Sequence, residues 1–121
     1  MVVEDQINNM RLIEQILEDI CPEIQLIKAF SGAEAILNAE KKDCNLVLMD
    51  ISLPDMNGIQ ITEKLKEYPN FTNIPFIAVT AHALVEDELN FRTFFDDYIS
   101  KPIDEDKLND VINKWVVINN E

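Results

Sequence analysis

Along this 121-residue chain, short apolar runs typical of strands take turns with longer segments in which apolar positions recur at helical spacing. Residues 46–49 and 76–79 are continuous apolar runs bounded by turn residues, too short for helices and typical of strands buried on both faces of a sheet. The longer segments between such runs repeat apolar side chains every three or four positions, as helices with one buried face do. The pattern predicts a parallel sheet covered by helices on both faces.

Five strand–helix units follow one another, without internal repeats or linkers, so we expect a single doubly wound α/β domain over residues 1–121. The first strand is short for a central strand. Asn8 or Asn9 is available to cap the first helix, and Ser31 with Glu34 forms a capping-box pattern at the second. The expected strands are 1–3, 23–30, 46–49, 76–80 and 98–100, and the expected helices are 7–20, 31–43, 58–68, part of 81–95 and a last one from 104.

The charge balance restricts the possible functions. Ten basic and twenty-three acidic side chains leave a formal charge of −13, which argues against direct binding to nucleic acid or to an anionic membrane surface and favours a cationic cofactor. No apolar run approaches the roughly 20 residues of a membrane span, and the first residues do not resemble a signal peptide, so a cytoplasmic location is predicted. Cys21 and Cys44 lack metal-site spacing and are predicted to be free thiols.

Polar side chains stand at the ends of four expected strands. In a parallel sheet these ends share one edge, where ligands bind, so we expect the side chains to converge there. Crowded carboxylates repel one another unless a cation neutralises them, and Mg²⁺ prefers oxygen ligands. A lysine and a hydroxyl could bind phosphoryl oxygens at the same place. The residues concerned are Glu4, Asp5, Asp50, Thr80 and Lys101.

Four motifs in one order resemble the receiver domains of two-component response regulators: V-V-E-D, D-I-S-L-P-D-M-N-G, A-V-T-A-H-A and D-Y-I-S-K-P-I. Each motif is weak alone, but together they cover essentially the whole chain. The resemblance implies the flavodoxin-like strand order 2-1-3-4-5. It also implies a signalling switch, rather than an enzyme that turns over a separate substrate.

The resemblance implies a role for each matching residue. Asp50 would accept the phosphoryl group, which is known chemistry for a carboxylate nucleophile. Asp5, Asp50 and the backbone carbonyl of Ser52 would hold Mg²⁺, with Glu4 reaching the ion directly or through water.

The remaining matches concern the phosphoryl group and the response to it. Thr80 and Lys101 would bind phosphoryl oxygens, and the bond from Lys101 to Pro102 would be cis. Thr80 and Tyr98 would act as the switch that changes the face made by the helix within 81–95, the strand 98–100 and the last helix. Ser52 and His82 occupy positions that tune dephosphorylation in the family.

Partners and alternatives follow from the same interpretation. The donor would be a histidine kinase or a histidine phosphotransfer protein, and a homodimer through the switch face is possible. The sequence leaves open a stand-alone regulator or the receiver of a hybrid histidine kinase. The alternatives are a metal-dependent phosphatase with an aspartyl-phosphate intermediate, a pseudo-receiver used only for docking, and a flavin carrier, which the acidic residues Glu4 and Asp5 disfavour because they would repel a phosphate.

Overall fold

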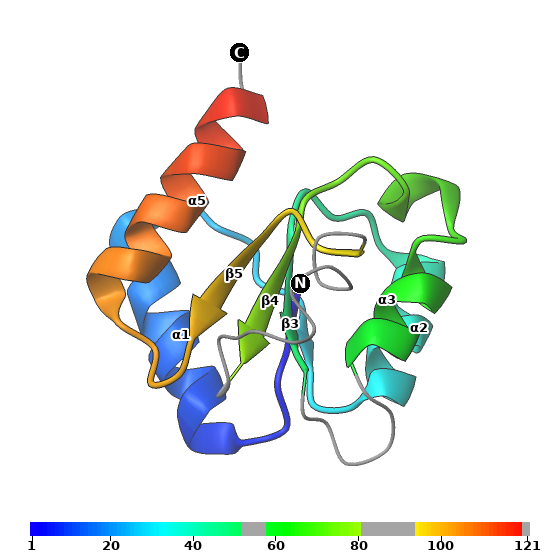
Figure 1. The fold of residues 1–121 in the computed structure, drawn as a ribbon, viewed down its shortest axis with the longest axis horizontal. Helices are drawn as coiled ribbons and strands as arrows, with labels where there is room; N and C mark the ends of the chain where they lie inside the picture. Colours follow the sequence, from blue (N-terminus) through cyan, green and yellow to red (C-terminus); the bar gives the residue numbers. More distant parts are fainter. Residues whose placement is uncertain (52–57, 81–93, 120–121) are drawn as a thin grey trace.

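The sheet has five parallel strands in the order β2-β1-β3-β4-β5, which confirms the predicted topology (Figure 1). The computed structural model describes residues 1–51, 58–80 and 94–119, with the side chains of 116–119 outside the description. Parallel pairing places the carboxyl ends of the strands at one edge. The strands are β1 (Val2–Val3), β2 (Lys28–Ala29), β3 (Val47–Asp50), β4 (Phe76–Thr80) and β5 (Asp97–Ser100).

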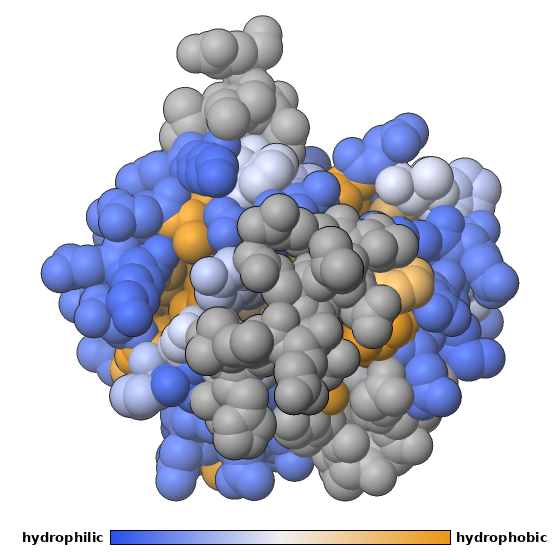
Figure 2. Space-filling model, viewed as in Figure 1, coloured by the Kyte–Doolittle hydropathy of each residue, from blue (hydrophilic) through white to orange (hydrophobic). Residues whose placement is uncertain are grey.

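Helices cover both faces of this sheet, as predicted (Figure 1). Helices α1 (Ile7–Ile20) and α5 (Glu105–Asn119) lie on one face, and α2 (Gly32–Lys41) and α3 (Gly58–Leu65) lie on the other. A 3₁₀-helix, η1 (Pro69–Phe71), follows α3. The described surface over these helices is mainly hydrophilic (Figure 2), as expected for helices that bury one face only.

Strands β3 and β4 form the centre of the core because every residue in both is buried. Alternate side chains enter opposite layers: Met49 and Ala78 pack on the α2 and α3 side, and Leu48 and Ile77 on the α1 and α5 side. Asp50 is paired in register with Val79. This two-sided burial explains the continuous apolar runs in the sequence and makes the sheet a rigid support for the residues at its edge.

The helix cap predicted for α2 is present, and the one predicted for α1 is not. At α2 the Ser31 hydroxyl accepts a hydrogen bond from the Glu34 amide at 3.1 Å, as the capping-box pattern predicts. The prediction that Asn8 or Asn9 caps α1 is wrong, because the helix begins at Ile7 and both asparagines lie inside it. Gln6 occupies the cap position without a side-chain cap bond.

Two element lengths also differ from the prediction. The strand expected over 23–30 is only Lys28–Ala29, because β2 is an edge strand whose partner β1 has two residues. Helix α3 ends at Leu65, before the expected 68. Most of the helix expected within 81–95 falls outside the described residues, apart from a half-buried Phe94 and a buried Phe95.

Both cysteines are free thiols, Cys21 exposed and Cys44 half-buried, as the sequence predicted. Among the helices that the structure describes, none has the length and apolar character needed to cross a bilayer.

Gly58 lies where α3 begins against the end of β3. A Cβ at this position would be 2.8 Å from the Asp50 carbonyl oxygen and 2.9 Å from the Ile51 Cα, which are both backbone atoms. The Gly58 amide also donates to the Ile51 carbonyl at 3.0 Å. Glycine therefore allows α3 to approach the backbone that carries Asp50.

We expect Gly58→Ala to lower the free energy of unfolding by about 1–3 kcal/mol, because the new methyl group can be accommodated only if backbone shifts. Urea unfolding would measure the loss. Glu63→Ala, on the exposed face of the same helix, is the control and should change stability by less than about 0.5 kcal/mol. Equal stability of the Gly58→Ala variant and the wild type would contradict the close approach.

Candidate functional site

Three carboxylates meet at the carboxyl edge of the sheet. Glu4 and Asp5 follow β1, and Asp50 is the last residue of β3. One carboxylate oxygen from each residue lies within 4.8 Å of the other two. Glu4 and Asp50 are 1% and 2% exposed, so two of the three charges are largely removed from water. Such a cluster is stable only with nearby positive charge.

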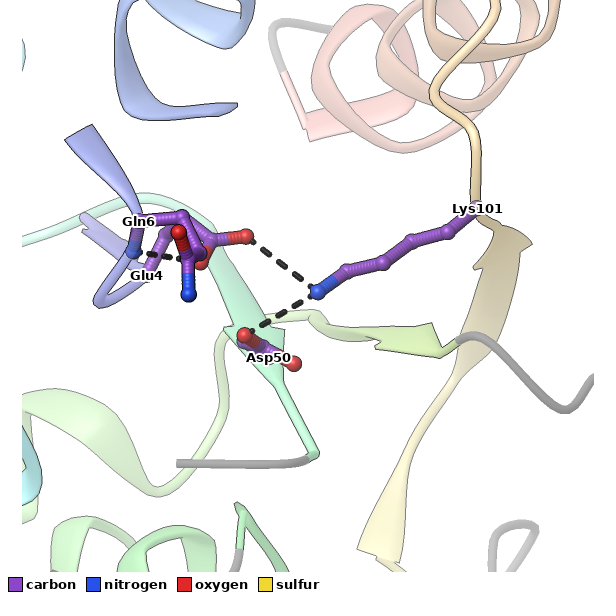
Figure 3. A network of polar contacts seen from close by, with 4 residues as sticks. All are labelled: Glu4, Gln6, Asp50 and Lys101. Carbon is purple, nitrogen blue, oxygen red and sulfur yellow. Dashed lines mark hydrogen bonds and ion pairs between the residues drawn. The ribbon is translucent and has the colours of Figure 1, made fainter. Parts of the chain in front are cut away.

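Lys101 provides that charge from the end of β5. Its side chain extends across the edge of the sheet toward the two buried carboxylates (Figure 3). Lys101 Nζ lies 3.2 Å from Asp50 Oδ2 and 3.5 Å from Glu4 Oε1. One ammonium therefore connects residues that β1, β3 and β5 bring together from distant parts of the chain.

Backbone hydrogen bonds position these side chains. The Glu4 amide donates to the Ala29 carbonyl at 3.0 Å, and the Lys101 amide donates to the Thr80 carbonyl at 2.8 Å. The peptide bond between Lys101 and Pro102 is cis. Thr80 ends β4 and is 5% exposed, one residue beyond the partner of Asp50 in the sheet register. The site therefore takes its geometry from the sheet.

Glu4 has an unusual electrostatic environment. Burial raises the pKa of Glu4 to about 7 from 4.5, and the charge of Asp50 acts in the same direction, while the Gln6 amide and Lys101 oppose it. The Gln6 amide donates to Glu4 Oε2 at 2.9 Å (Figure 3). Glu4 Oε1 is buried and makes no hydrogen bond within the described residues, although the Lys101 ammonium is near.

Burial alone lowers the pKa of Lys101, but the nearby charges of Asp50 and Glu4 outweigh it, so the pKa of Lys101 is raised. The lysine therefore stays protonated at neutral pH. Counted formally, three carboxylates and one ammonium carry a charge of −2, and protonation of Glu4 reduces it to −1. The donor atoms are all oxygens, and the buried Glu4 Oε1 has no hydrogen bond, so this set of residues fits a small divalent cation such as Mg²⁺.

Tyr98 lies on β5 and is half exposed. It pairs with Ala78 in the parallel register, and Ala78 packs on the α2 and α3 side of the sheet. Because paired residues in adjacent strands point to the same side, the Tyr98 ring lies on that side too.

The structure brings together Glu4, Asp5, Asp50 and Lys101, with Thr80 at the end of the neighbouring strand. Ser52 and His82 lie outside the described residues. Sequence reasoning missed Gln6, whose amide binds Glu4. Gln6 stands directly after the acidic pair and before a helical pattern. The first amides of a helix need acceptors, so this position could have indicated a hydrogen bond to Glu4.

Known proteins match this chain over most of its length. The model of the response regulator receiver domain family matches residues 1–113. The chain is 37% identical over 117 residues to the polar-differentiation response regulator DivK of Brucella ovis, covering 96% of this chain and 94% of DivK. It is 36% identical over 116 residues to the histidine-protein kinase BarA of Escherichia coli K12, covering 95% of this chain but only 12% of BarA.

A solved structure with the same fold contains a magnesium ion. It is the receiver domain of the sensor histidine kinase PA1611 from Pseudomonas aeruginosa PAO1, with a magnesium ion coordinated in the active-site cleft. The TM-score is 0.84 with 29% sequence identity, covering 96% of this chain and 94% of the PA1611 domain.

The raised pKa of Glu4 predicts a pH-dependent stability. Between pH 4.5 and about 7 the folded state keeps a proton that the unfolded chain releases, so metal-free wild type should lose stability as the pH rises through this window. Glu4→Gln removes this titration. Relative to that variant, the wild type should lose up to about 3 kcal/mol of unfolding free energy.

Urea unfolding with EDTA, near pH 5 and near pH 8, would measure the difference. Glu63→Gln, at an exposed position, is the control and should follow the wild type at both pH values. A stability difference between wild type and Glu4→Gln that is the same at both pH values would show that Glu4 ionises normally.

Proposed function

Because the chain belongs to the response regulator receiver domain family, we propose that it is a switch whose Asp50 accepts a phosphoryl group from a phosphohistidine donor. The observation that carries the proposal is the buried Asp50 carboxylate, 3.2 Å from Lys101 and clustered with Glu4 and Asp5. This is a carboxylate nucleophile with the positive charge beside it that phosphoryl transfer needs.

The chemical step conserves charge and atoms. An Asp50 oxygen attacks phosphorus, the phosphorus–nitrogen bond of the donor breaks, and the imidazole leaves as an acyl phosphate forms on Asp50. Lys101 is placed to bind a phosphoryl oxygen because its ammonium already lies beside Asp50. Transfer of this kind depends mainly on positioning and electrostatic stabilisation, which a preformed site supplies.

The acidic cluster would hold Mg²⁺, which neutralises charge on the transferring phosphoryl group when bound. Asp5, Asp50 and the backbone carbonyl of Ser52 are the proposed ligands, and Glu4 takes part directly or through water. The oxygen-only donor set supports this assignment, as does the magnesium ion in the similar PA1611 domain.

The proposed response reaches the surface through Thr80 and Tyr98. A phosphoryl group on Asp50 provides a new charged acceptor for the Thr80 hydroxyl and favours the conformer that makes this bond. The half-exposed Tyr98 lies on the neighbouring strand and can change rotamer. The changed face would include β5 and α5, and a homodimer could form there.

The proposed donor is a histidine kinase or a histidine phosphotransfer protein. BarA is itself a histidine-protein kinase, and DivK is a response regulator matched along 94% of its length, so both a hybrid-kinase receiver and a separate regulator are represented among the relatives. The charge of −13 supports a domain that signals through protein contacts and does not bind nucleic acid or membrane itself.

We expect acetyl phosphate, a small phosphoryl donor, to add one phosphate-sized mass to the wild type only when Mg²⁺ is present, since the carboxylates would otherwise repel the donor. Intact-protein mass spectrometry would detect it. Asp50→Asn should abolish the gain, and Asp110→Asn, at an exposed position on α5, should keep it. Equal phosphorylation of Asp50→Asn and the wild type would place the acceptor elsewhere, and a wild type that gains no mass with Mg²⁺ would favour a docking pseudo-receiver.

We also expect Mg²⁺ to raise the melting temperature without phosphate. Ligand that binds only the folded state at ten times its dissociation constant adds about 1.4 kcal/mol of stability. Calorimetry with Mg²⁺ and with EDTA would show the difference. Asp5→Asn should remove most of the rise while Asp110→Asn retains it, and a full Mg²⁺ response in Asp5→Asn would locate the ion away from the cluster.

A further inference from the structure

Gln6 is an exposed polar residue beside the acidic cluster. It directly follows Glu4 and Asp5, and its backbone amide donates to Glu4 Oε2 at 2.9 Å (Figure 3). One carboxylate oxygen of Glu4 lies within 4.8 Å of oxygens from Asp5 and Asp50. The backbone of Gln6 is therefore fixed next to the carboxylate that is the proposed phosphoryl acceptor, and its long, rotatable side chain starts from this point.

The side chain of Gln6 holds no described residue in place. Gln6 occupies the cap position of α1 with an extended backbone (φ −84°, ψ 118°), but its carboxamide makes no cap bond. Its hydrogen bonds to the described residues use the backbone, to Glu4 through the amide and to Met10 through the carbonyl. The exposed carboxamide, which has both a donor and an acceptor, is therefore available to a molecule that enters the site.

No other described neighbour of the site offers the same chemistry. Of the described residues that adjoin Glu4, Asp5, Asp50, Thr80 or Lys101 in sequence, Gln6 and Pro102 are exposed. Proline has no polar side-chain atom, so the carboxamide of Gln6 is the exposed hydrogen-bonding group of this set.

Phosphoryl transfer to Asp50 gives such a group a defined place. Asp50 is 2% exposed at the end of β3, so its oxygen would attack phosphorus from the protein side, and in-line displacement puts the leaving group opposite, toward solvent. Lys101 Nζ, 3.2 Å from Asp50 Oδ2, lies beside the attacking oxygen. An exposed side chain at the edge of the site is therefore better placed than Lys101 to meet the leaving group.

We propose that Gln6 is a specificity-determining residue whose carboxamide contacts the leaving group of a small phosphoryl donor. The inference rests on the proposed function of Asp50. With acetyl phosphate, an Asp50 oxygen bonds to phosphorus, the bond from phosphorus to the acyl oxygen breaks, and acetate leaves with the electron pair while the Gln6 NH₂ donates to it. With phosphoramidate, the protonated nitrogen leaves as ammonia, and the Gln6 carbonyl accepts from it. A neutral carboxamide therefore serves both kinds of leaving group.

The test compares the rate constants of phosphorylation by acetyl phosphate and by phosphoramidate at saturating Mg²⁺, followed by intact-protein mass spectrometry. Gln6→Glu keeps an acceptor, removes the donor and adds negative charge. We expect its acetyl phosphate rate constant to fall about tenfold while the phosphoramidate rate constant is retained. Gln6→Met removes donor and acceptor at similar length, and both rate constants should fall about fivefold. Each substitution leaves the backbone bond from residue 6 to Glu4 in place.

Two controls isolate the contact from its surroundings. Asn8→Glu adds the same charge at an exposed position in the first turn of α1, and it should change the ratio of the two rate constants by less than about twofold because solvent and salt screen an exposed charge. Gln15→Met removes an exposed carboxamide elsewhere on this helix and should retain both rate constants. Calorimetry checks that each variant is folded at the assay temperature, and Gln6→Leu replaces Gln6→Met if the latter is not.

A wild type that neither donor phosphorylates would overturn the proposed function itself. A wild type that is phosphorylated while Gln6→Glu keeps the wild-type ratio of rate constants would overturn only the role of Gln6. The ratio is the decisive quantity, because a purely structural defect lowers both rate constants together.

Discussion

The ion pair between Lys101 and the buried carboxylates of Asp50 and Glu4 is the interaction on which the site depends. Two carboxylates with 1–2% exposure cannot remain ionised side by side without compensation, and one ammonium compensates only part of their charge. Burial accordingly moves the pKa of Glu4 to about 7. This incomplete neutralisation leaves the cluster able to attract a cation, as the proposed phosphoryl transfer to Asp50 requires.

The sheet determines where this charge lies. Parallel strands bring the residues after β1, β3 and β5 to one edge, and the two buried layers behind them resist movement. At the opposite edge, Asp96, Asp97 and Lys66 hold the chain that enters β5. The strand that carries Tyr98 is therefore restrained at both ends, so the proposed response to phosphorylation is more easily made by a rotation of the Tyr98 ring than by a sliding strand.

Much of this arrangement could be predicted from the sequence. The apolar runs before Asp50 and Thr80 predicted β3 and β4, and the helical pattern from Ile7 to Ile20 predicted α1 at its observed bounds. The prediction for β2 was too long because a strand's length depends on its partner, here the two-residue β1. The contacts of Lys66 with Phe94 and of Trp115 with Asp97 join residues 28 and 18 positions apart, and no local pattern indicates such pairs. The order of the motifs indicated which residues converge. It did not indicate that burial would raise the pKa of Glu4 to about 7.

The long sequence separations within the site also affect how the protein is made. Glu4 precedes nearly the whole chain and Lys101 follows most of it, while β1 pairs with both Lys28 and Leu48 and so depends on segments synthesised after it. Such non-local pairing forms late and slowly during folding. A partly synthesised chain that ends before Lys101 therefore presents Asp50 without its lysine, and a chain whose sheet has not formed presents Asp50 without Glu4 and Asp5 held beside it. Under the proposed function, competence to accept a phosphoryl group therefore arises only when the sheet is complete, and a histidine donor would react with folded molecules and not with unfolded ones.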